Sequence, residues 1–151
     1  MSERKRIAVS GGMDPPHCGH TRMILAAAEL GDVVVILNSD AWLKRKKGFS
    51  FYPTWEERAE VIRAFKGVIS VEPVDDADGT VCEALERLRP YGFANGGDRK
   101  TESTPEVALC NKLGIELIWD VGAGGKVSSS SWLVDAAAKI ASIRAVPADL
   151  S

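Results

Sequence analysis

The segment 11–20 holds the residues of this chain that are best suited to chemistry. It reads Gly-Gly-Met-Asp-Pro-Pro-His-Cys-Gly-His and lies between the apolar run 7–9 and an alanine-rich apolar run. Glycines let the backbone approach an anion closely, and a helix that begins directly after them adds N–H groups and a positive dipole end. His17 and His20, three residues apart, can then both face the bound charge. The segment predicts an anion site suited to a phosphate.

A second candidate is the basic run Lys44-Arg45-Lys46-Lys47, which follows the apolar run 33–37 and Asn-Ser-Asp at 38–40. Four basic residues in a row usually form a solvated face. Here the run follows a predicted strand, at the edge of the sheet where ligands bind, so Lys47 and Lys44 could reach substrate phosphates. The other charges could steer anions inward.

The elements that must position these residues alternate between strands and helices. Strands are expected at 7–9, 33–37, 68–71, 93–94 and 115–119, and helices after the first motif, from Thr54 to about Phe65, from Thr80 to before Pro90, from Pro105 to Gly114, and from about Ser131 to Ser142. Thr54 with Glu57, and Thr80 with Glu83, form sequence patterns of a capping box. The alternation predicts a Rossmann-like single α/β domain, with a five-stranded, mainly parallel sheet and helices on both faces. Segments 11–20, 38–48, 96–98 and 122–131 each follow a strand, so they are expected at one edge.

The length and composition of the chain set further expectations. Its 151 residues suit one domain over 1–151, with residues 1–6 and 144–151 loosely held. The sequence has no signal-peptide pattern and no apolar run long enough for a bilayer, so a soluble, cytoplasmic protein without membrane contact is expected. Three cysteines, an odd number, suggest free thiols, and a net charge of −2 argues against a nucleic-acid partner.

Segment 11–20 resembles the G-[TS]-F-D-x-x-H-x-G-H motif of the cytidylyltransferase-like nucleotidyltransferases, with Met13 where that family usually has Phe. The resemblance covers nearly the whole chain. It includes Asn-Ser-Asp at 38–40, Lys47-Gly48, Arg58, Gly-Gly-Asp at 96–98 and the serine run 128–131, all in the family's order. These elements are most similar to the heptose-phosphate adenylyltransferase branch, followed by glycerol-phosphate cytidylyltransferase. The arginine of the latter's Arg-Thr-Glu-Gly element is absent, and Lys126 lies in its region.

The resemblance implies a Mg²⁺-dependent reaction in which a phosphate oxygen of a small phosphorylated sugar or alcohol attacks the α-phosphorus of ATP or CTP, and pyrophosphate leaves. It implies three groups of site residues. The catalytic group is His17, His20 and Lys47. The nucleotide-binding group is Gly11, Gly12, Met13, Asp14, Gly19, Gly97, Asp98, Ser129, Ser130 and Ser131. The acceptor-binding group is Lys44, Lys46 and Arg58.

Several alternatives stay open at this stage. Arg58 suits an acceptor contact or an ordinary surface helix, Gly-Gly-Asp suits a plain turn, and one serine of 128–131 suffices for a helix cap. Asp98 could hold a hydroxyl or help to bind Mg²⁺. The aromatic residues 42, 49, 51 and 52 suit an acceptor, a core or a homodimer contact. The choice between ATP and CTP, the acceptor, the register of the serine motif and the role of Lys126 are undecided.

Three other functions were weighed against the transferase. Zinc ligation by His17, Cys18 and His20 has little support, because the sequence offers no further Cys or His pair to complete the site. A P-loop at 122–126 fails its template at two positions, Asp120 and Val127. A non-catalytic nucleotide-binding or sensor domain of the same fold is the main alternative function.

Overall fold

The computed structural model describes residues 4–48, 53–96, 104–122 and 136–142. These residues form one five-stranded sheet of β1 (Arg6–Gly11), β2 (Asp32–Leu37), β3 (Val68–Glu72), β4 (Gly92–Ala94) and β5 (Glu116–Ile118). The strand order is β3-β2-β1-β4-β5, and every pairing is parallel. The predicted α/β architecture is confirmed. Because the order reverses between β1 and β4, a ligand is expected beyond the carboxyl end of β1.

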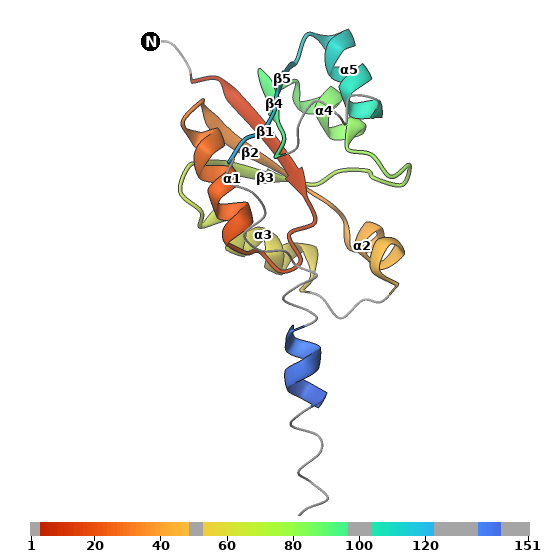
Figure 1. The fold of residues 1–151 in the computed structure, drawn as a ribbon. Helices are drawn as coiled ribbons and strands as arrows, with labels where there is room; N and C mark the ends of the chain where they lie inside the picture. The colour runs from red at the N-terminus through yellow and green to blue at the C-terminus, as the bar shows by residue number, and fades with distance from the viewer. Residues whose placement is uncertain (1–3, 49–52, 97–103, 123–135, 143–151) are drawn as a thin grey trace, which may run out of the picture.

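The helices cover both faces of the sheet, as predicted (Figure 1). They are α1 (Cys18–Ala28), α2 (Asp40–Lys47), α3 (Trp55–Arg63), α4 (Cys82–Leu88) and α5 (Pro105–Leu113). Ile24 of α1 and Ile62 of α3 are buried with β1 and β2 residues in one core cluster. Leu85 of α4 and Cys110 of α5 belong to a second cluster that includes Phe93. A further helix spans 136–142, and its residues are exposed.

The helix boundaries follow the predicted caps in two of three cases. The Thr54 hydroxyl accepts a hydrogen bond from the Glu57 N–H at the start of α3, and α5 runs from Pro105 to a left-handed Gly114. The predicted capping box at Thr80 is wrong. Its hydroxyl donates to Asp78 and accepts from the Cys82 N–H, and Val81 is the N-cap of α4 without a side-chain hydrogen bond.

The helix α2 was not among the elements predicted from the sequence. The Ser39 hydroxyl caps its N-terminus by accepting from the Trp42 N–H at 3.0 Å, and Gly48 ends it in the left-handed region with φ 80°. The four basic residues all lie in the last turn, where positive charge stabilises the negative end of the helix dipole. The basic run is therefore part of an ordered helix directly after β2.

The expectation of loosely held ends covers residues 1–6 and 144–151, and only 4–6 lie within the described residues. Arg6 begins β1, and Arg4 donates to the Ala28 carbonyl at 2.9 Å and pairs with Asp32 at 3.4 Å. Residues 4–6 thus belong to the fold. Among the residues that the structure describes, no helix has the length and apolar character needed to span a membrane.

Candidate active site

His17 and His20 lie together at the start of α1, directly beyond the carboxyl end of β1. His17 is the N-cap, and its Nδ1 accepts from the Gly19 N–H at 3.1 Å. The Nδ1 of His20 in turn accepts from the His17 backbone N–H at 3.1 Å. The two rings stack with centroids 3.8 Å apart and an interplanar angle of 27°. This is a capping box made by two histidines, and it holds both rings in place.

The hydrogen bonds also determine the protonation of the rings. A nitrogen that accepts an N–H carries no proton, so in the neutral form of each ring the proton sits on Nε2, which is the donor. Burial, together with the repulsion that a protonated His17 would exert, lowers the pKa of His20 from 6.5 to about 4. His20 is therefore neutral at pH 7. A neutral donor suits an anion whose charge develops during a reaction.

The lowered pKa of His20 predicts a loss of stability in acid. Between pH 6.5 and about 4, the unfolded chain binds a proton at His20 that the folded chain does not. The contribution of neutral His20 to the free energy of unfolding is complete above pH 6.5 and is lost as the pH falls towards 4. Glutamine at this third helical position keeps a capping box without titrating. Between pH 7 and roughly pH 5, we expect the free energy of unfolding, measured in urea, to fall by about 1–2 kcal/mol more in wild type than in His20→Gln. The same loss in both proteins would contradict the assignment.

The glycine turn that precedes α1 packs against α2. A Cβ atom at Gly12 would lie 2.7 Å from Leu43 Cδ2 and 3.1 Å from Asp14 Oδ1, so a larger residue there would have to displace these side chains. Met13 has a φ of 48° and is 1% exposed, and its side chain belongs to the core beneath the turn. A nucleotide could therefore contact the backbone of Met13 but not its side chain. Gly19, which was predicted to bind the nucleotide, donates its backbone N–H to His17 Nδ1.

Asp14 and Lys47 connect the turn with the end of α2. Lys47 Nζ lies 3.8 Å from Asp14 Oδ2, and the side chains are 18% and 7% exposed. This Asp14 oxygen is buried and accepts no hydrogen bond among the described residues. At this distance the contact between Lys47 and Asp14 is an ion pair rather than a hydrogen bond. Lys44, Arg45 and Lys46 are exposed on the same helix, and the Lys46 ammonium lies 4.7 Å from the centre of the Trp42 ring. Lys47 alone among the four is placed beside the glycine turn.

Arg58 is fully buried, which neither sequence-based interpretation anticipated. Its guanidinium donates to the Gly12 carbonyl at 2.6 Å, to the Pro53 carbonyl at 3.1 Å and to Asp40 Oδ1 at 2.7 Å. With 0% exposure it presents no surface to an acceptor and is not an ordinary surface arginine. We interpret Arg58 as a residue that joins the glycine turn, the start of α2 and the start of α3.

A metal centre made by the protein alone is not found in the described part of the chain. No group of three or more His, Cys, Asp and Glu residues there is arranged to hold a metal ion. The zinc alternative thus gains no support, and Cys18, Cys82 and Cys110 are free thiols as predicted. Mg²⁺ is usually held by one or two carboxylates together with substrate phosphates. The Mg²⁺ that the resemblance implies stays a prediction.

Several predicted site residues fall outside the described residues. They are Gly97 and Asp98 after β4, Ser129, Ser130 and Ser131 of the serine run, Lys126, and the aromatic residues at 49, 51 and 52. The turn that leads towards the serine run packs against α1, because a Cβ at Gly122 would lie 3.1 Å from Met23 Cα. The roles of these residues remain predictions.

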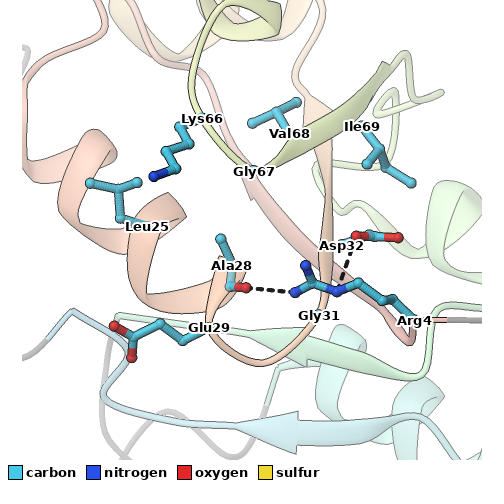
Figure 2. Close-up of a pocket in the computed structure, with 10 residues that line it drawn as sticks. All are labelled: Arg4, Leu25, Ala28, Glu29, Gly31, Asp32, Lys66, Gly67, Val68 and Ile69. Carbon is cyan, nitrogen blue, oxygen red and sulfur yellow. Dashed lines mark hydrogen bonds and ion pairs between the residues drawn. The ribbon is translucent and has the colours of Figure 1, made fainter.

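A pocket at the opposite end of the sheet is separate from this site (Figure 2). It is lined by the end of α1, the start of β2 and the start of β3, with Arg4 and Lys66 among its charged residues. The Arg4 guanidinium is already bound to Asp32 and to the Ala28 carbonyl. The histidines, Lys47 and Arg58 do not line this pocket. We therefore place the candidate active site at the carboxyl edge.

The model of a protein family described as cytidylyltransferase-like matches residues 8–131. This chain belongs to the cytidylyltransferase-like family. The matched range contains the histidine pair, α2 and Arg58, so the resemblance seen in the sequence is confirmed.

Curated relatives within this cytidylyltransferase-like group carry several names. An FAD synthase of Pyrococcus abyssi is 34% identical over 65% of this chain and 66% of its own length. A phosphopantetheine adenylyltransferase of Methanopyrus kandleri is 35% identical over 86% of this chain and 89% of its own. The bifunctional protein HldE of Streptomyces coelicolor is 36% identical over 72% of this chain, which spans only 23% of HldE.

A solved structure shares the fold of this cytidylyltransferase-like chain. The lipopolysaccharide core biosynthesis protein of Thermoplasma volcanium aligns with a TM-score of 0.62 and 24% identity, covering 77% of this chain and 93% of its own. At that identity the likeness establishes the fold alone.

Proposed function

We propose that this protein transfers the nucleoside monophosphate of a nucleoside triphosphate to a small phosphorylated sugar or alcohol and releases pyrophosphate. The observation that carries the proposal is the histidine capping box beside the glycine turn, with Lys47 on the facing helix at the same edge. A triphosphate–Mg²⁺ complex and an acceptor phosphate are both anions. A site that offers neutral N–H donors and the Lys47 ammonium, held in place by Asp14, can bind both anions side by side.

In the proposed reaction the acceptor's phosphate oxygen attacks the α-phosphorus in line, and the bond to the pyrophosphate oxygen breaks. The enzyme then needs no nucleophile of its own, and its task is to bring like charges together and stabilise them. His17 and His20 would donate from Nε2 to the α-phosphate and its bridging oxygen. Lys47 would neutralise a phosphate that approaches from the side of α2.

The names of the relatives support ATP as the donor. The phosphopantetheine adenylyltransferase, by its name, transfers the adenylyl group, and its alignment spans 86% of this chain. We therefore place ATP before CTP. A homodimer and a cytoplasmic location remain predictions from the sequence.

Pyrophosphate release tests this function directly. Purified protein would be given Mg²⁺ with each of the four nucleoside triphosphates, with and without a panel of sugar and polyol phosphates. We expect release with ATP only when a phosphorylated acceptor is present. Tight ATP binding with no release across a broad panel would instead support a nucleotide-binding domain without catalysis.

A further inference from the structure

Asp76, in the loop after β3, makes more contacts to the active-site edge than sequence analysis gave reason to expect. Its side chain is buried, and one carboxylate oxygen accepts from Asn38 Nδ2 at 3.0 Å and from the Ser39 N–H at 2.9 Å. The other oxygen accepts from the Ser39 hydroxyl at 2.6 Å. The Asp76 carbonyl also accepts from Arg45 Nη2 at 2.9 Å. One residue thus holds both the N-cap and the last turn of α2.

These contacts connect Asp76 with the residues expected to bind substrate. Ser39 is the N-cap of α2, and Lys47 is its last residue. Lys47 pairs with Asp14, and Leu43 packs against Gly12. A helix of eight residues is too short to be stable alone, so its position depends on its anchors. A shift at its N-terminus would move Lys47 relative to the glycine turn.

We propose that Asp76 is a positioning residue that fixes α2 and thereby holds the Lys47 ammonium beside the glycine turn for the acceptor's phosphate. This inference rests on the proposed function. Asp76 does not itself face a ligand, because it is buried and both carboxylate oxygens accept hydrogen bonds from the two residues before α2, Asn38 and the N-cap Ser39. A carboxylate suits this role because three donors converge on it, and charge-assisted hydrogen bonds are about twice as strong as neutral ones.

The variant Asp76→Asn tests this role with a nearly unchanged shape. The asparagine NH₂ group would face an N–H or O–H of Asn38 or Ser39 that now donates to the carboxylate. At least one of the hydrogen bonds that hold the start of α2 is therefore lost. We expect the acceptor's KM to rise about tenfold or kcat to fall by a similar factor, while nucleotide affinity changes less than about twofold. Asp75→Asn is the matched control, because Asp75 is exposed and, among the described residues, its carboxylate accepts a hydrogen bond only from the Ala77 N–H of its own loop. The control should leave these constants unchanged.

A double variant shows whether Asp76 acts through Lys47. Lys47→Ala alone should raise the acceptor's KM, and adding Asp76→Asn should worsen it little further, because the ammonium to be positioned is already absent. If the factors by which the two single substitutions raise the acceptor's KM multiply in the double variant, the proposal is overturned. If Asp76→Asn fails to fold, Ser39→Ala removes a partner of the same carboxylate from the other side and should give the same pattern of constants.

Amide hydrogen exchange gives a readout that does not depend on activity. In Asp76→Asn, peptides from 39–47 should exchange faster, while peptides from α1 stay unchanged. Unchanged exchange over 39–47 would overturn the anchoring role even if the enzyme is active. Absence of pyrophosphate release from wild type, with faster exchange in the variant, would instead contradict the proposed function and leave the anchoring of α2 intact.

Discussion

Replacing His17 by asparagine is expected to lower kcat by about 10²–10³ while leaving the fold intact. Loss of one preorganised donor to charge that develops in the transition state costs about this factor. Asparagine is among the best N-cap residues, so its side-chain oxygen can still accept from the Gly19 N–H. His20→Gln applies the same logic at the third helical position, where glutamine completes a capping box. Both variants remove an imidazole and keep a cap.

The measurements are kcat for pyrophosphate release, the dissociation constant for the nucleotide and the urea midpoint. We expect a large fall in kcat, a small change in nucleotide binding and a nearly constant midpoint. His17→Ala is the contrasting variant, because it also removes the cap and should lose about 1 kcal/mol of stability. A variant that keeps near-normal kcat would show that the histidine serves only to cap α1.

The fold could be predicted from sequence because its signals are local. Continuous apolar runs marked β1 and β2, and Thr54, Pro105 and Gly114 marked helix ends. The predicted capping box at Thr80 does not form, for two reasons. The Thr80 hydroxyl donates instead to Asp78, two residues earlier, and the Glu83 carboxylate accepts from the Asp75 N–H. Helix α2 has ordinary cap signals at Ser39 and Gly48, but the four consecutive basic residues between them carry no apolar periodicity that would indicate a helix.

The arrangement of site residues can be predicted from the sequence when a single helix start holds the whole motif. The pairing of His17 with His20 follows from a spacing of three residues, and the structure confirms it. Arg58 contacts Gly12, which is 46 residues away in the chain, and Asp76 contacts Arg45, which is 31 residues away, and no local pattern reveals such contacts. One signal for Asp76 was available. It follows β3 at the same carboxyl edge as the motifs that follow the other four strands.

Arg58→Ala is expected to reduce the free energy of unfolding by about 3–5 kcal/mol. The change removes the donor to the Gly12 and Pro53 carbonyls and leaves a cavity at a position with 0% exposure. Asp40, its ionic partner, is 55% exposed and can be solvated, so the cost comes mainly from the buried side. A domain has roughly 5–15 kcal/mol in total, so this single change would bring the protein close to unfolding at 37 °C.

The matched control is Arg63→Ala on the same helix, where the side chain is exposed and its guanidinium lies 6.0 Å from the Trp55 ring centre. It should change stability by less than about 1 kcal/mol. Urea unfolding of both variants, alongside steady-state kinetics at a temperature where both are folded, distinguishes two roles. Equal stability, with a raised acceptor KM only in Arg58→Ala, would restore Arg58 as an acceptor contact. A large loss of stability, with kinetic effects on both substrates, would instead establish Arg58 as the residue that holds the glycine turn against α2.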